Sequence, residues 1–160
     1  MSVNPFDIKT VLFARHAQHV VFVHFPIALF IAAVALDFIA QWKKSRALAA
    51  TVYFNLLLAA IFTVPVVATG LVAWQWALEG RTLKGILLTH LVLGCISSVL
   101  IWIVLWIHWR GWRVPETPLP VFRLAVEGIG VLLLGLTGHL GGFLSGVTGQ
   151  CEIRRNSQKS

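Results

Sequence analysis

The chain has 160 residues, of which 58% are hydrophobic and only 12% are charged. A soluble domain carries about 25% charged residues, so this composition excludes a soluble globular protein and indicates an integral membrane protein. The net charge of +7 comes from 13 Lys and Arg against 6 Asp and Glu. In a membrane protein such charges belong to loops and interfaces, so they do not indicate nucleic-acid binding.

Four apolar stretches are each long enough to span a bilayer, which takes roughly 20 helical residues. They cover residues 18–40, 48–74, 86–108 and 120–144. The first is too long for the apolar region of a signal peptide, and no small-x-small cleavage site follows it, so it is predicted to stay in the mature protein. The connections are short, which predicts antiparallel neighbours. The sequence therefore predicts an all-α integral membrane protein, a four-helix up-down bundle in which residues 1–160 form a single transmembrane domain surrounded by lipid.

The positive charges that flank these stretches are divided almost evenly between the two sides of the membrane. The cluster formed by Lys43, Lys44 and Arg46, directly after the first stretch, favours the cytoplasmic side for that connection. We therefore predict a multi-pass protein of the bacterial inner (cytoplasmic) membrane with both termini in the periplasm.

Histidines lie inside three of the four stretches, at His24, His90 and His139. From the rise of about 1.5 Å per helical residue, His24 lies roughly 9 Å inside the first stretch, His90 roughly 6 Å inside the third and His139 roughly 8 Å before the end of the fourth. The first and third stretches start on the side where the fourth ends, so all three imidazoles share one level. A histidine in hydrocarbon is costly without a partner. We predict that these three bind a metal or a metal-centred cofactor.

Small and cationic residues near this level complete the predicted cofactor site. Gly94 lies one helical turn from the third-stretch histidine, and Gly135 and Gly142 belong to a seven-residue glycine repeat around the fourth-stretch histidine. Such residues allow either close helix packing or a flat ligand against the backbone. Arg15 and Arg81 lie at the same face and can neutralise haem propionates.

The histidine pattern leaves several cofactors open. A b-type haem takes two axial imidazoles from facing helices, a chlorophyll takes one, and a copper or zinc site uses all three. We predict a haem-b-binding electron-transfer subunit of a larger redox complex. The alternative is a non-redox structural or chlorophyll-binding accessory subunit, for example of a photosynthetic complex. No nucleophile–base pair, phosphate-binding loop or paired carboxylates accompany the histidines, so the chain is not expected to be an enzyme on its own.

Polar residues toward the opposite face form a second group. Asp37 and Glu127 lie within their stretches, and an intramembrane carboxylate requires a cation, for which Arg46 and Arg123 are the nearest candidates by level. The simplest interpretation is a structural ion pair that fixes helix register. The functional alternatives are a proton path or a quinone pocket. His108, at the end of the third stretch, is predicted to be solvated at the interface.

Two other histidines, His16 and His19, lie at the start of the first stretch and are predicted to be interfacial.

Three sequence strings resemble those of a known family. They are VHFPIAL from Val23 with the following Asp37, LTHLVLG around the third-stretch histidine, and GHLGGFLSGVTG around the fourth-stretch histidine. Together, over residues 16–150, they resemble domain-of-unknown-function family 2231, which comprises bacterial four-helix membrane proteins. The resemblance implies that fold. Some relatives carry c-type cytochrome modules, which implies a redox setting with a c-type cytochrome as a partner. The chain departs from the usual family ending at 143–145, where Phe-Leu-Ser replaces a Tyr-containing stretch.

Overall fold

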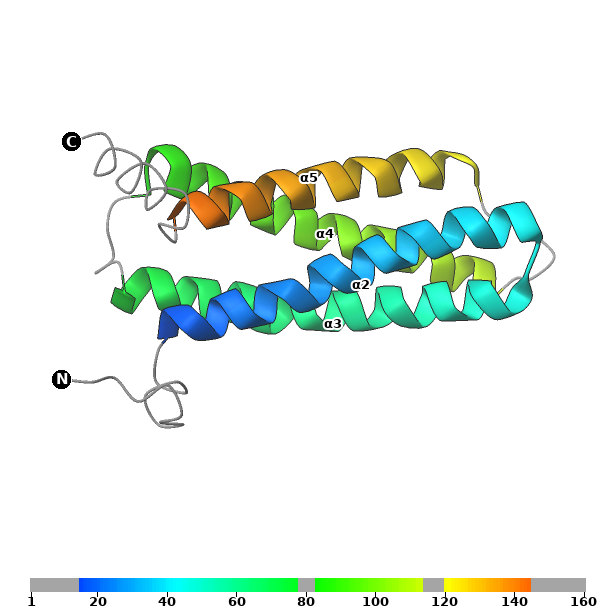
Figure 1. The fold of residues 1–160 in the computed structure, drawn as a ribbon, viewed down its shortest axis with the longest axis horizontal. Helices are drawn as coiled ribbons and strands as arrows, with labels where there is room; N and C mark the ends of the chain where they lie inside the picture. Colours follow the sequence, from blue (N-terminus) through cyan, green and yellow to red (C-terminus); the bar gives the residue numbers. More distant parts are fainter. Residues whose placement is uncertain (1–14, 78–82, 114–119, 145–160) are drawn as a thin grey trace, which may run out of the picture.

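The computed structural model describes residues 15–77, 83–113 and 120–144. These residues form four long helices: α2 (Arg15–Lys43), α3 (Arg46–Ala77), α4 (Gly85–Arg113) and α5 (Phe122–Leu144). The helices run up and down along one long axis, so that the start of α2 and the end of α5 lie at the same end of the bundle (Figure 1). The predicted all-α four-helix bundle is confirmed.

The outer surface of the bundle is apolar on every helix. All four helices are long and apolar enough to cross a membrane. Large hydrophobic side chains are exposed on each of them, for example Phe38, Leu58, Trp102 and Leu132. Contiguous exposed apolar surface of this extent is rare on a soluble monomer. These helices therefore present their outer faces to lipid, as expected for a membrane protein.

The helix ends are set by local backbone geometry. After α2, Lys44 has a φ of 50°, and the N–H of Ser45 donates to the carbonyl of Ala40 at 3.1 Å. This is the hydrogen bond of a Schellman helix end. The Ser45 hydroxyl then accepts the N–H of Leu48, which caps the start of α3. Because the connection is this short, α2 and α3 form a tight hairpin.

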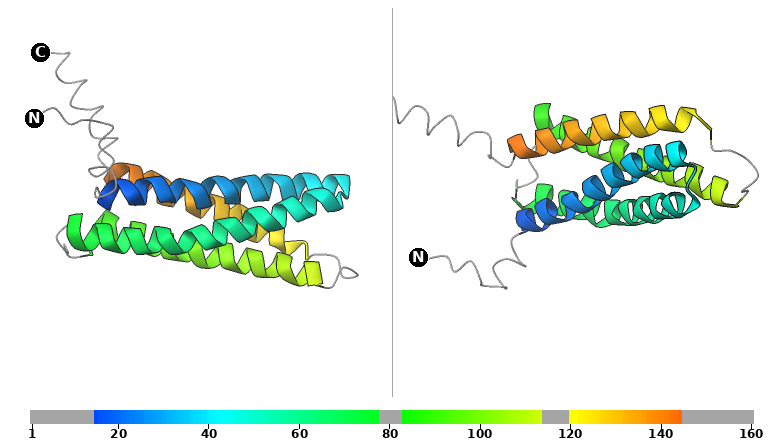
Figure 2. Two further views of the ribbon diagram at one scale, coloured as in Figure 1. Left: turned by 90° about the horizontal axis from the view of Figure 1, so that it is seen from below. Right: turned by 45° about the vertical axis from the view of Figure 1, so that its right-hand side comes forward.

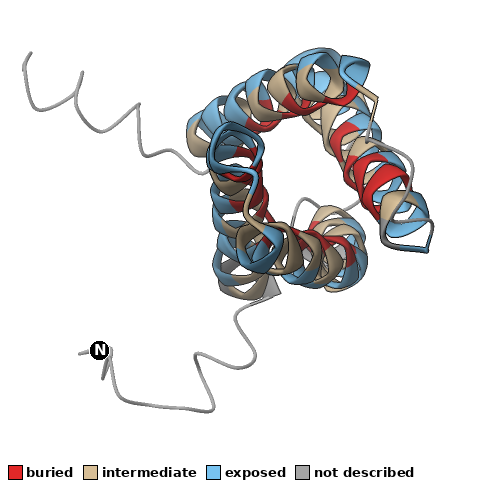
Figure 3. Ribbon diagram, turned by 90° about the vertical axis from the view of Figure 1, so that its right-hand side faces the viewer, coloured by how far each residue is buried: buried red, intermediate tan, exposed pale blue. Residues whose placement is uncertain are grey.

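The bundle consists of two such hairpins, α2–α3 and α4–α5. Figure 2 shows α2 alongside α3, and α4 packs against α5. Viewed along the long axis, the buried residues of all four helices face inward (Figure 3). They form one hydrophobic core in which each helix supplies a largely buried side chain: Phe30, Leu56, Ile101 and Leu134.

The two hairpins bury many equivalent positions, displaced by 71 residues. On α2 and α4 the buried residues Phe30, Ala33 and Val34 correspond to the buried residues Ile101, Val104 and Leu105. On α3 and α5 the buried residues Ala59 and Thr63 correspond to Gly130 and Leu134. Because both hairpins start at the same end of the bundle, they form a parallel internal repeat, of the kind related by rotation about an axis along the membrane normal.

The core is tightest where α5 lacks a side chain. A Cβ at Gly130 would lie 2.7 Å from Leu100 Cδ2 and 2.8 Å from Cζ of Phe30, whose side chain is fully buried. Gly130→Ala is therefore expected to destabilise the bundle by about 1–3 kcal/mol through overpacking. Thermal unfolding in detergent measures this change. A Cβ at Gly128 would contact nothing within 4 Å, so Gly128→Ala is the matched control, and equal stability of both variants would contradict the prediction.

Candidate functional site

Two histidines from different hairpins meet at the end of the bundle where α2 and α4 begin. The imidazole rings of His19 on α2 and His90 on α4 have centroids 6.4 Å apart and are nearly perpendicular, at 89°. Both side chains are partly buried. The 71 residues that separate them are the period of the internal repeat, so they occupy equivalent positions in the two hairpins.

Each imidazole is held by the second helix of its own hairpin in the same way. The Nδ1–H of His19 donates to the carbonyl of Val66 at 3.1 Å, and that of His90 donates to the carbonyl of Thr137 at 3.0 Å. In both cases the carbonyl lies 47 residues after the histidine. The Thr69 hydroxyl gives His19 a second contact, at 3.3 Å from Nδ1. These bonds fix the orientation of both rings.

A glycine lies against each ring, four residues after the carbonyl that orients it. A Cβ at Gly70 would lie 3.0 Å from Cε1 of His19, and a Cβ at Gly141 would lie 3.1 Å from Cε1 of His90. Real Cβ atoms seldom approach so closely. Each imidazole can therefore pack against the neighbouring helix because the residue there is a glycine. These two glycines, rather than the predicted seven-residue repeat, contact histidines.

The other two predicted histidines are exposed. His24 donates from Nδ1 to the carbonyl of Val20 on its own helix at 2.6 Å, and His139 has its ring centroid 6.3 Å from that of Phe143. A helix turns by about 100° per residue. His24 therefore lies about 140° around α2 from His19, and His139 about 200° around α5 from Thr137. The structure does not bring these two residues to His90.

The predicted supporting residues have different surroundings. Gly94 is partly buried, and its Cβ would lie 3.8 Å from the Thr137 methyl, so it belongs to the contact between α4 and α5. A Cβ at Gly135 or Gly142 would meet nothing within 4 Å, so neither provides the close helix contact that their spacing suggested. The side chain of Arg15 and the whole of Arg81 lie outside the described residues.

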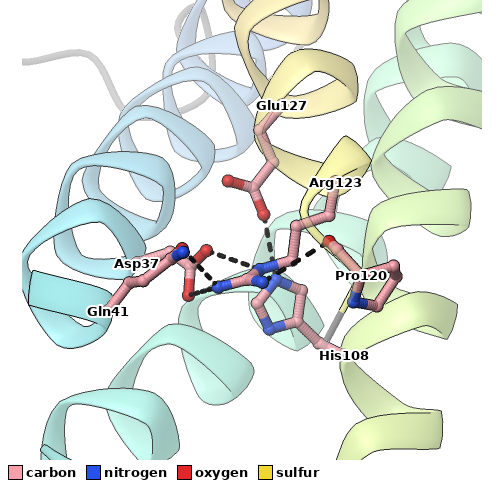
Figure 4. Close-up of polar contacts among 6 residues, drawn as sticks. All are labelled: Asp37, Gln41, His108, Pro120, Arg123 and Glu127. Carbon is pink, nitrogen blue, oxygen red and sulfur yellow. Dashed lines mark hydrogen bonds and ion pairs between the residues drawn. The ribbon is translucent and has the colours of Figure 1, made fainter. Parts of the chain in front are cut away.

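At the opposite end, a buried ion pair joins α2 to α5. Arg123 Nε donates to Asp37 Oδ2 at 2.9 Å, and Nη2 donates to Oδ1 at 3.4 Å and to Gln41 Oε1 at 2.9 Å (Figure 4). Its Nη1 also contacts the carbonyl of Pro120 at 3.5 Å. Asp37 and Arg123 are 3% and 5% exposed. The predicted ion pair is confirmed, with Arg123 rather than Arg46 as the cation.

A second buried pair lies beside the first. Nε2 of His108 and Oε1 of Glu127 are 2.9 Å apart (Figure 4), and the two residues are 6% and 1% exposed. The prediction that His108 is solvated is wrong, because a carboxylate one turn after Arg123 provides it with a hydrogen-bond partner inside the bundle. Oε2 of Glu127 is buried and has no hydrogen-bond partner.

We call Asp37, His108, Arg123 and Glu127 the polar cluster. One possible ligand atom each from Asp37, His108 and Glu127 lie within 4.8 Å of one another, which is close enough for a metal ion. The guanidinium of Arg123 already occupies both oxygens of Asp37, however. Sequence position alone did not reveal this cluster, because the hydrogen bond between His108 and Glu127 depends on how α4 and α5 are rotated.

Comparison with known proteins identifies a family and no individual relative. The model of the family described as "Predicted membrane protein (DUF2231)" matches residues 15–150. No curated protein and no solved structure matches the chain.

Proposed function

Because the chain belongs to the DUF2231 family of predicted membrane proteins, we propose a function that operates within the membrane: it is a b-type cytochrome that transfers electrons. His19 and His90 would hold the iron of one haem between the two hairpins. His90 was predicted from the sequence as a ligand, and His19 takes the place of His24.

The separation of the two rings carries this proposal. A metal–imidazole nitrogen bond is about 2.0–2.1 Å long, and a ring nitrogen lies about 1.2 Å from the ring centre, so two imidazoles that bound one metal ion would have ring centres at most about 6.5 Å apart. The observed separation between His19 and His90 is 6.4 Å. Two imidazoles from facing helices of a bundle are a usual ligand set for a b-type haem.

The protonation of the rings supports the same proposal. A backbone carbonyl only accepts hydrogen bonds, so the Nδ1 atoms that contact Val66 and Thr137 must carry protons. In a neutral imidazole the lone pair then lies on Nε2, and this is the atom that binds a metal. A carbonyl bond to the opposite nitrogen is also the usual way in which a protein orients a histidine ligand.

The bound haem would supply one-electron redox chemistry, and the chain would hold it near one membrane face. His19 lies four residues after the start of α2, or roughly 6 Å along the helix. An electron partner is therefore proposed to dock at the end of the bundle where α2 begins. The family resemblance suggests a c-type cytochrome as that partner.

The visible absorption spectrum of the purified chain, oxidised and then reduced with dithionite, tests this proposal. A sharp α-band and a shifted Soret band upon reduction are expected, with one haem per chain by pyridine haemochrome assay. A far-red pigment band would instead favour a chlorophyll-binding subunit. If material from the native membrane has a featureless spectrum and no bound copper or zinc, the histidines serve only to join helices, as in a structural accessory subunit.

A further inference from the structure

The charges of the polar cluster do not cancel when its histidine is neutral. Asp37 and Arg123 neutralise each other through two hydrogen bonds. If His108 is neutral and Glu127 is ionised, one negative charge remains on a side chain that is 1% exposed. Burying such a charge in a membrane protein is costly. One added proton makes the cluster neutral.

We propose that Glu127 and His108 form a proton-binding site that takes up and releases one proton at the end of the bundle opposite the histidine pair. The Nε2–H of His108 donates to Oε1 of Glu127, and a proton from water binds to Oε2, the oxygen without a partner. Figure 4 shows this second oxygen directed away from His108. The carboxylate becomes a carboxylic acid, the charge of the cluster changes from −1 to 0, and release reverses the step.

Polar side chains lie between the site and the exposed end of α2. Gln41 is exposed and bonded to Arg123, which is bonded to Asp37, so a chain of polar groups runs inward from the end of α2. Within the part of the chain that the structure describes, the charged or titratable groups that act on Glu127 are Asp37 from α2, His108 from α4 and Arg123 on its own helix. On α3, the positions equivalent to Arg123 and Glu127 in the repeat are the buried apolar residues Val52 and Leu56, which add no charge.

A proton fits this cluster better than a divalent metal ion does. A doubly charged ion would change the cluster from one negative to one positive charge, beside a guanidinium only 2.9 Å from Asp37. It would also compete with Arg123 for the oxygens of Asp37. A single proton neutralises the cluster and leaves every observed hydrogen bond in place.

Infrared spectroscopy of the full chain in lipid nanodiscs, recorded as a function of pH, tests the proposal. We expect one carboxylic-acid C=O band that appears as pH falls while solvated Asp and Glu, which titrate at about pH 4, are still ionised, and this band should shift in D₂O. Glu127→Gln, in which the amide oxygen still accepts from His108, should lose this band. Glu79→Gln, which removes a carboxylate between α3 and α4 in the sequence, should keep it.

Two outcomes would overturn the proposal. One is the absence of any carboxylic-acid band from the wild-type chain above about pH 5.5, where solvated Asp and Glu are ionised, and this outcome needs no variant to interpret. The other is stoichiometric binding of Zn²⁺ by the wild type that is lost in Glu127→Gln, because it would make the cluster a metal site. Neither measurement involves haem, so the proton site stands or falls separately from the proposed cytochrome.

Discussion

His19→Ala and His90→Ala are each expected to abolish low-spin haem binding, so that the purified variants lack the reduced α-band of the wild type. The reason is that the two imidazoles occupy equivalent positions in the two hairpins and have ring centroids only 6.4 Å apart. Removing one leaves an iron with at most one protein ligand from this pair. Haem per chain and the reduced-minus-oxidised spectrum measure the loss.

The two exposed histidines provide matched controls for this experiment. His24→Ala and His139→Ala remove residues that are exposed on α2 and α5, so each should retain one haem per chain. If His24→Ala or His139→Ala lost the haem while His19→Ala kept it, the proposed ligand pair would be wrong. All four proteins should be compared by circular dichroism, because a change in helix content would explain loss of haem without any role as a ligand.

Arg123→Ala is expected to lower the free energy of unfolding by about 3–5 kcal/mol, because it leaves a buried carboxylate without its cation. Arg123 also bonds to Gln41 and thereby connects α5 to α2 at two points. Thermal unfolding, or titration with a denaturing detergent, measures the change.

Two further variants separate this effect from nonspecific damage. The double variant Asp37→Ala/Arg123→Ala lacks both the carboxylate and the guanidinium, so it buries no unpaired charge from this ion pair. It should therefore be more stable than Arg123→Ala alone. Arg110 is exposed and lies over the ring of Trp106, so Arg110→Ala should cost at most about 1 kcal/mol. A double variant less stable than Arg123→Ala would show that the ion pair is not the source of the effect.

The four helices were predictable because each coincides with a stretch of apolar residues long enough to span the membrane. A span of about 20 apolar residues in lipid must satisfy its own backbone, and an α-helix does this within one segment. The charge pair was also partly predictable, because a carboxylate such as Asp37 inside a span requires a cation nearby.

The rotation of each helix was not predictable from depth. His24 and His19 lie five residues apart on different faces of α2, and only His19 reaches α4. The same limitation applies to His108, whose partner Glu127 depends on how α4 and α5 face each other. The internal repeat is the signal that would have found His19: a shift of 71 residues aligns it with His90 and aligns Gly70 with Gly141.

The internal repeat distinguishes the histidine pair, which is made of equivalent residues, from the polar cluster, which is not. Because His19 and His90 are equivalent, two identical copies of one hairpin, associated about a two-fold axis, would provide the same pair of imidazoles. The polar cluster cannot arise in this way, since the residues equivalent to Asp37, Val52 and Leu56 are His108, Arg123 and Glu127. Such complementary charges require two halves free to diverge. Joining the hairpins in one polypeptide thus permits an asymmetric centre that a homodimer of half this length would lack.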